Sequence, residues 1–214
     1  MTTRIAQISD THLSPGKPFF GANFDRVADV LRDSRPDIVI NTGDLSLDGA
    51  DQEADLVEAK AAHDALGLEW YGLPGNHDTG DHPEVAIRQP ANAERLARWN
   101  RVVGSDSWVL DVPGWRLLGL NALTLGTALE GADVQAELIG RTLDGLAGRS
   151  LAVFLHKPLM DEAYCETLVS NRFCTPGARQ AMLDALGDAH PALVCCGHVH
   201  QYRDTTHSGT RHIW

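Results

Sequence analysis

The sequence has few basic side chains and no long apolar run, and each shortage excludes a class of protein. Eighteen lysines and arginines stand against 29 aspartates and glutamates, so the formal net charge is −11. A surface this acidic repels nucleic-acid backbones, and we expect no nucleic-acid polymer as a partner. No apolar run approaches the roughly 18 residues that a membrane span needs. The polar stretch 9–12 comes before a signal-peptide core can form, so the sequence predicts a cytoplasmic protein without a membrane partner.

Cysteine is also scarce, with four residues and no Cys-x-x-Cys pair, which excludes the usual zinc and redox motifs. Cys195 and Cys196 are neighbours inside an apolar run, and we expect buried thiols that act as small hydrophobes. Cys165 and Cys174 fall in an expected loop. A disulfide between them stays open as an alternative, although a reducing cytoplasm disfavours it.

With 43% hydrophobic residues in 214, the chain can bury the core of a single domain spanning 1–214. Short apolar runs alternate with amphipathic segments, and two further pairs of runs flank glycine-containing turns, so the pattern predicts an α/β sandwich with outer helices. The predicted single strands are 4–8, 37–41, 69–73, 151–155 and 193–196. The predicted hairpins are 108–112 with 115–120 and 202–206 with 210–214. The predicted helices are 24–32 (capped by Asn23), 52–66, 92–103, 136–146 and 178–186.

Five predicted strands end in side chains that can bind a metal ion or transfer a proton. In α/β sheets, ligands bind in the crevice beyond the carboxyl ends of the strands, so these side chains should converge. Leaving His77 aside, two carboxylates, one amide oxygen and four imidazoles suit Mn, Fe, Co or Zn better than calcium. Seven ligands exceed the need of one four-coordinate ion and fit two divalent ions. The side chains are Asp10, His12, Asp44, Asn76, His77, His156, His198 and His200.

In these motifs the sequence resembles the calcineurin-like metallophosphoesterases. The motifs Asp10-x-His12, Gly43-Asp44, Gly75-Asn76-His77-Asp78, His156 and Gly197-His198-x-His200 follow the family's order over residues 8–200. The stretches 8–13 and 155–158 are most similar to the branch of class III cyclic-nucleotide phosphodiesterases and glycerophosphodiesterases. The resemblance implies a four-layer αββα sandwich of two mixed sheets flanked by helices.

The resemblance also implies a role for each motif residue. Asp10, His12, Asp44 and His200 would bind the first metal; Asp44 as a bridge, Asn76, His156 and His198 would bind the second. His77 would be the proton donor, and we expect Asp78 to hold its imidazole in position. The implied function is hydrolysis of a small phosphodiester, a cyclic nucleotide or a glycerophosphodiester, by a hydroxide that bridges two Mn, Fe or Zn ions.

Several alternatives stay open beside this interpretation. A non-catalytic interaction module would keep the fold but lack the ligands, and a phosphomonoesterase would share them. Residues 45–49 lack the Asp-Arg-Gly of the family's protein phosphatases, and Asp78 stands where those have Glu. Among the remaining histidines, His63 is predicted to be solvated on a helix, and His82 and His190 are predicted in loops. His207 and His212 flank the final turn, and each of these two has a small chance of touching substrate. Lys17 could reach a phosphate.

The end of the chain departs from the family pattern. It stops 14 residues after His200, in the apolar stretch 211–214 that resembles an unfinished strand. Because members of the family generally continue with further strands, either the chain is truncated or the second sheet is small. An exposed strand edge would then favour a homo-oligomer.

Overall fold

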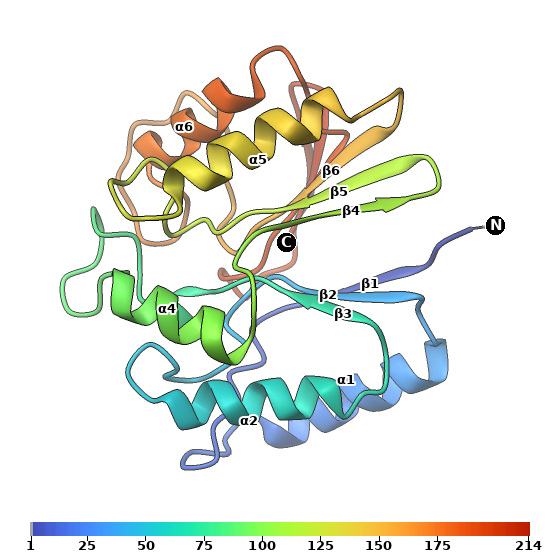
Figure 1. The fold of residues 1–214 in the computed structure, drawn as a ribbon, viewed down its shortest axis with the longest axis vertical. Helices are drawn as coiled ribbons and strands as arrows, with labels where there is room; N and C mark the ends of the chain where they lie inside the picture. The colour runs from blue at the N-terminus through green and yellow to red at the C-terminus, as the bar shows by residue number, and fades with distance from the viewer. Residues whose placement is uncertain (1) are drawn as a thin grey trace.

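The first half of the chain forms a parallel sheet whose strands end in one row. A computed structural model describes residues 2–214 (Figure 1). The sheet has the order β1-β2-β3, and its parallel register aligns Ile8 with Asn41 and Asn41 with Gly72. The three loops that follow therefore start side by side at the same edge. The elements of this half are β1 (Ile5–Ile8), α1 (Gly21–Ser34), β2 (Ile38–Asn41), α2 (Glu53–Asp64), β3 (Trp70–Gly72), α3 (Asn76–Thr79) and α4 (Ala93–Val102).

The second half forms a mixed six-stranded sheet with the order β4-β5-β6-β7-β9-β8. Its two hairpins, β4–β5 and β8–β9, are antiparallel, while β5, β6, β7 and β9 run parallel to one another. Phe154 pairs with Cys195, so the segments after β6 and β7 also begin level with one another. The elements are β4 (Trp108–Val112), β5 (Trp115–Gly119), α5 (Ala132–Asp144), β6 (Ser150–Phe154), α6 (Pro176–Leu186), β7 (Leu193–Cys195), β8 (Asp204–His207) and β9 (Thr210–Ile213).

The two sheets stack on each other, and helices cover their outer faces (Figure 1). Strand side chains alternate between faces, so Ile38 and Ile40 enter the core between the sheets whereas Val39 packs towards α1 and α2. In β6, Phe154 faces the core between the sheets and Val153 packs with residues of α5 and α6. Burial on both faces explains the continuous apolar runs of these strands. The predicted four-layer αββα sandwich is confirmed.

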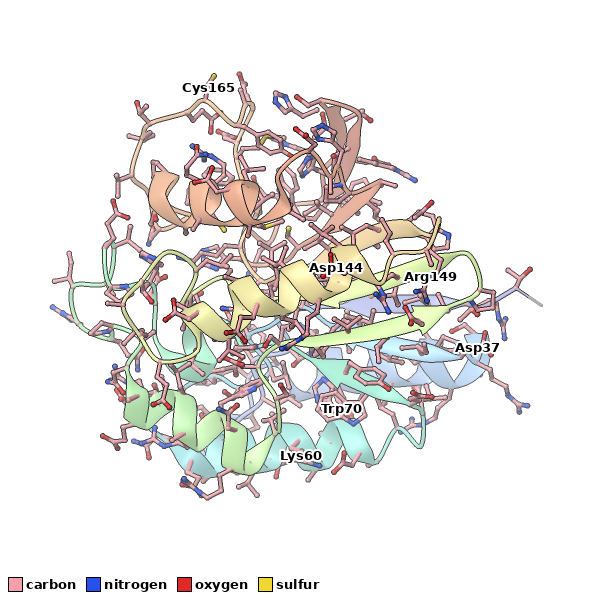
Figure 2. The ribbon with its side chains drawn as sticks, turned by 45° about the horizontal axis from the view of Figure 1, so that its top comes forward. Asp37, Lys60, Trp70, Asp144, Arg149 and Cys165 are labelled. Carbon is pink, nitrogen blue, oxygen red and sulfur yellow. The ribbon has the colours of Figure 1, made fainter. Side chains whose placement is uncertain are left out.

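The predicted elements are found with shifts of a few residues, and four details differ. Helix α1 begins at Gly21, with Phe20 rather than Asn23 at its N-cap position, and the short helix α3 was not predicted. All four cysteines are free, and Cys165 lies on the outer rim of its loop (Figure 2). The second sheet is not small: it is the larger sheet, with β9 inside it and β8 at its edge.

Over residues 2–214, none of the helices combines the length and the apolar character that crossing a membrane requires.

Candidate metal centre

The loops after β1, β2, β3, β6 and β7 meet at one edge of the stacked sheets and bring the predicted ligands together. Their potential ligand atoms form three overlapping groups, and within each group all of these atoms lie within 4.8 Å of one another. Sharing of His12 and Asp44 between groups makes this a single continuous cluster. The groups are Asp10 with His12 and His200, His12 with Asp44 and His77, and Asp44 with His156 and His198.

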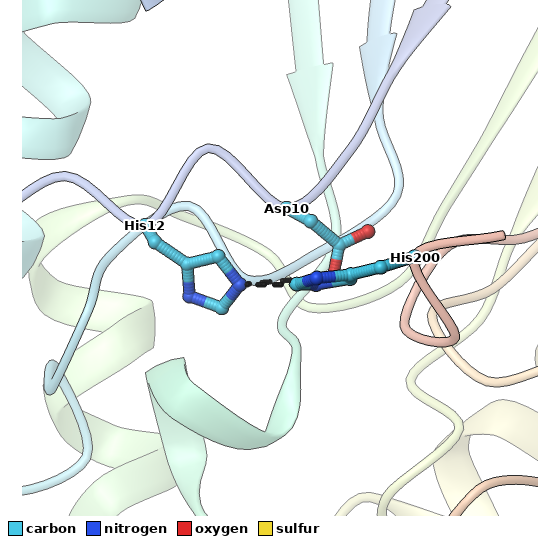
Figure 3. Close-up of side chains that lie close together, drawn as sticks. All are labelled: Asp10, His12 and His200. Carbon is cyan, nitrogen blue, oxygen red and sulfur yellow. Dashed lines mark hydrogen bonds and ion pairs between the residues drawn. The ribbon is translucent and has the colours of Figure 1, made fainter. Parts of the chain in front are cut away.

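The first group joins the loop after β1 to the loop after β7 (Figure 3). His12 Nε2 lies 3.3 Å from His200 Nε2, and His200 Nε2 lies 3.1 Å from Asp10 Oδ1. The other carboxylate oxygen of Asp10 accepts a hydrogen bond of 2.9 Å from the backbone N–H of His198. The two loops, 188 residues apart in sequence, are thus tied together at the atoms that would hold an ion.

In the third group, Asp44 with His156 and His198, the surroundings fix the tautomers of the two histidines. His156 Nδ1 lies 2.9 Å from the carbonyl oxygen of Thr42, and His198 Nε2 lies 2.7 Å from that of Asn171. Because a carbonyl can only accept, both of these nitrogens carry the proton. The opposite nitrogens, His156 Nε2 and His198 Nδ1, then face each other at 3.2 Å.

Oxygen acceptors complete this third group. His156 Nε2 lies 3.2 Å from Asn76 Oδ1 and 3.3 Å from Asp44 Oδ2. In neutral rings, four acceptor atoms therefore converge without a side-chain donor between them, an arrangement that a bound cation satisfies. The mixed nitrogen and oxygen donors fit a first-row divalent ion.

The charges of the site show the same demand for a cation. Burial works against ionisation of Asp44, but His156, His77 and His12 lower its pKa further than burial raises it. Burial likewise opposes the charged form of His156, yet Asp44 and Asp10 raise the pKa of His156 to about 9. In the absence of an ion, a proton on His156 compensates the carboxylates. Binding of a divalent ion must release that proton, so metal affinity should fall as the pH falls.

The backbone at the ligands is held in a conformation that side chains rarely adopt. Among residues 2–214, eight non-glycine residues have a positive φ, and five of them are predicted metal ligands. Such strain persists only where the surrounding structure imposes it, and it concentrates at functional sites. The five are Asp10 (57°), His12 (44°), Asp44 (53°), His198 (69°) and His200 (53°).

His77 lies beside the ligands and its ring is anchored, but not by the residue expected. His77 Nδ1 lies 2.6 Å from the carbonyl oxygen of Leu47 and therefore donates to it, while its backbone N–H donates to Asp44 Oδ1 at 2.8 Å. The carboxylate of Asp78 is buried and accepts from the backbone N–H groups of Leu45, Ser46 and Gly75 and from the Ser46 hydroxyl. Asp78 therefore shapes the loop that carries Asp44, and the prediction that it holds the His77 imidazole directly is wrong.

The site opens into a cavity of about 290 Å³, and six of its eight lining residues have polar side chains. Its two apolar lining residues are Phe20, which follows the β1 loop, and Leu47. The Phe20 ring lies 5.6 Å from the His12 ring, between centroids. Sequence reasoning missed both residues because neither belongs to a motif. Predicted ligands line most of the rest of the cavity: His12, Asp44, Asn76, His198 and His200, with His77.

The remaining histidines lie outside this cluster, and one corrects the sequence prediction. His63 is fully buried between α2 and the first sheet, where it contacts Asn41, so its predicted solvated position is wrong. His82 hydrogen-bonds the carbonyl of Leu125, and His212 contacts the Tyr164 hydroxyl. Lys17 is exposed on the loop that leads to α1.

The sequence is similar to those of proteins named as phosphodiesterases. It is 27% identical to a probable glycerophosphodiester phosphodiesterase, GpdQ, of Arcobacter nitrofigilis, over 94% of this chain and 73% of that protein. It is 29% identical to the 3',5'-cyclic adenosine monophosphate phosphodiesterase CpdA of Pseudomonas aeruginosa, over 94% and 70% respectively, and 28% identical to CpdA of Escherichia coli, over 97% and 73%.

Solved structures share the fold at lower identity. A dimetal phosphatase from Danio rerio superposes with a TM-score of 0.62 at 16% identity, covering 99% of this chain and 86% of that one. A purple acid phosphatase from yellow lupin gives a TM-score of 0.70 at 15% identity, covering 99% and 43%. Residues 3–202 match the family model of the calcineurin-like phosphoesterases. The predicted resemblance, including its phosphodiesterase branch, is confirmed. The chain belongs to the calcineurin-like phosphoesterases.

Proposed function

We propose that this chain is a phosphodiesterase that uses two divalent metal ions to hydrolyse a small phosphodiester, either a cyclic nucleotide or a glycerophosphodiester. The observation that carries the proposal is the convergence of the acceptor atoms of Asp44, Asn76, His156 and His198 with no donor between them. A phosphodiesterase name is shared by the relatives at 27–29% identity, which supports this reaction over hydrolysis of a monoester.

Each ligand has a place in the proposed centre. Asp10, His12 and His200 would hold one ion, Asn76, His156 and His198 the other, and Asp44, which belongs to two of the ligand groups, would contact both. Bound there, manganese, iron or zinc would supply an activated water nucleophile and Lewis-acid polarisation of the phosphoryl group. The hydrogen bond from His156 to Thr42 and that from His198 to Asn171 would leave the opposite ring nitrogens available as ligands.

His77 is the proposed proton donor to the leaving oxygen. Its Nδ1 is held by the Leu47 carbonyl, so Nε2 is the nitrogen free to exchange a proton with a substrate in the cavity. General acid catalysis of this kind needs the donor within hydrogen-bond reach of the leaving atom. The ring lies 4.6 Å from that of His12, between centroids, which places it at the border of the metal ligands.

The charge distribution favours a small substrate. Two divalent ions outweigh the carboxylates of Asp10 and Asp44, so the loaded site attracts one phosphate group. The rest of the protein is acidic, with a net charge of −11, and repels a long polyanion. The site therefore suits a small phosphodiester better than DNA or RNA.

One experiment tests the proposal against its alternatives. The purified protein is depleted of metal, reloaded with Mn, Fe, Co or Zn separately, and assayed with a bis-aryl phosphate, cyclic nucleotides, glycerophosphodiesters and phosphomonoesters. We expect two ions per chain and turnover of a diester. Two ions with turnover of monoesters alone would make the chain a phosphomonoesterase. Neither bound metal nor turnover would favour a non-catalytic interaction module.

A further inference from the structure

A buried lysine lies directly behind the proposed metal centre, and the reaction proposed above does not use it. The Lys157 side chain is 1% exposed, and its Nζ lies 2.5 Å from Asp81 Oδ1. Lysine is almost never fully buried in proteins unless it is paired. Lys157 follows the predicted ligand His156, and Asp81 lies on the segment that leaves α3, which carries the predicted ligand Asn76.

Asp81 is a fixed point rather than a mobile partner. Its backbone N–H donates to the carbonyl of Gln89 at 2.8 Å, and its carbonyl accepts from the N–H of Ala91 at 2.7 Å. Its side-chain Oδ1 also accepts from the backbone N–H of His82 at 2.7 Å. The carboxylate is therefore held in place before Lys157 reaches it.

The ion pair ties together the two segments that carry His156 and Asn76, which meet at the third ligand group. At the site, His156 Nε2 lies 3.2 Å from Asn76 Oδ1. On the buried side, Lys157, the residue after His156, pairs with Asp81, which lies five positions after Asn76. When His156 is neutral, as a metal ligand must be, its Nε2 and Asn76 Oδ1 are both acceptors and do not attract each other. The ion pair with Asp81 is a direct attraction that holds the two segments together.

Stability alone is a weak reason for such a pair. Removing two charges from water is costly, and a well-packed apolar pair of similar volume often stabilises a fold as well or better. The location of the pair beside His156 suggests instead that it contributes to the geometry of the neighbouring ligands. We propose that Lys157 and Asp81 are positioning residues that set the spacing of His156 and Asn76 and so create the second of the two metal sites. The inference rests on the proposed function, since it assumes that the chain binds two metal ions.

The test measures metal binding, which does not depend on turnover. Manganese is titrated into the metal-free full chain by calorimetry, for the wild type, Lys157→Met and the control Arg116→Met. The control breaks an ion pair with the exposed Asp111 near the amino end of the second sheet, far from the ligands at its carboxyl end. We expect two ions in the wild type and the control. In Lys157→Met the first ion should bind as in the wild type and the second about 10- to 100-fold more weakly.

A second variant keeps the inference testable if Lys157→Met does not fold. Lys157→Met with Asp81→Leu replaces the pair by apolar side chains, so no charge is left buried without a partner, and it should fold while still losing affinity for the second ion. In both variants diester hydrolysis should be weak at low manganese and recover at high manganese. Unchanged affinity for both ions in either folded variant overturns the role of Lys157 and leaves the proposed function intact. A wild type that binds no metal overturns the proposed function, and the inference with it.

Discussion

His63 makes folding stability depend on pH, through an arrangement that the structure fixes in detail. The side chain is fully buried, its Nδ1 donates to the carbonyl of Ala59 at 2.7 Å, and its Nε2 lies 2.9 Å from the side-chain nitrogen of Asn41. The side-chain oxygen of Asn41 accepts from the N–H of Gly43, so its NH₂ group donates to His63. Nε2 must then be an acceptor, and only a neutral His63 fits.

The size of the effect follows from the pKa of His63 in the two states. Burial lowers the pKa of His63 from 6.5 to about 4 in the folded protein. Because the folded state resists protonation of His63, the neutral side chain makes its full contribution to folding stability above pH 6.5. That contribution is lost as the pH drops towards 4. The full loss is about 3 kcal/mol, and about 2 kcal/mol of it is reached at pH 5. A loss of that size is a large part of the stability of an ordinary domain.

Chemical denaturation of the metal-free protein at pH 7 and pH 5 measures this contribution. The comparison is between the wild type and His63→Gln, which has no titrating group at this position, and other histidines contribute equally to both proteins. We expect the stability difference between them to shift by about 2 kcal/mol in favour of the variant on going to pH 5. His190→Gln, at an exposed loop position, controls for the removal of one histidine. An equal pH dependence for the wild type and His63→Gln would refute the assignment of a neutral, trapped imidazole.

Three further predictions concern the site. Asp44→Ala should abolish diester hydrolysis and reduce the bound metal, because Asp44 belongs to two of the ligand groups; wild-type activity in this variant would exclude the bridging role. His77→Ala should retain both ions and lower kcat by about 100- to 10,000-fold, as loss of a general acid does; full activity would remove the proton-donor role. Manganese at 100 times its Kd should raise the free energy of unfolding by about 2.7 kcal/mol for each ion, measured by denaturation with and without a chelator. No stabilisation would contradict binding to the folded state.

The sequence was sufficient to predict the strands and the convergence of the candidate ligands, and the reason is physical. Strands buried on both faces produce short apolar runs, and in parallel sheets the ends of such runs lie at one edge. Asp10, Asp44 and Asn76 follow Ile8, Asn41 and Gly72, which are adjacent in the sheet register. Pattern and topology thus predict the same cluster.

Contacts between distant segments could not be predicted in the same way. Asp78 was assigned to its neighbour His77, but its carboxylate binds backbone groups more than thirty residues away. The sequence predicts a solvated His63 on a helix, whereas its Asn41 partner comes from another element and buries it. Lys157 and Asp81 are separated by 76 residues, and neither has a periodicity or motif that indicates the other. Such pairs depend on the packing of loops, which sequence periodicity does not encode.

The strained ligands explain why the site needs the rigid sheets behind it. A positive φ at a non-glycine residue costs of order 1 kcal/mol or more, and five of the proposed ligands have one. Relaxation of any of these residues would turn its side chain away from the cluster. The hydrogen bond from the His198 N–H to Asp10 and that from the His77 N–H to Asp44 oppose relaxation by using ligand oxygens as backbone acceptors. The same carboxylates therefore hold the loops in their strained conformation and present the charge that attracts the ions, so a substitution at either aspartate should disturb the shape of the site as well as its charge.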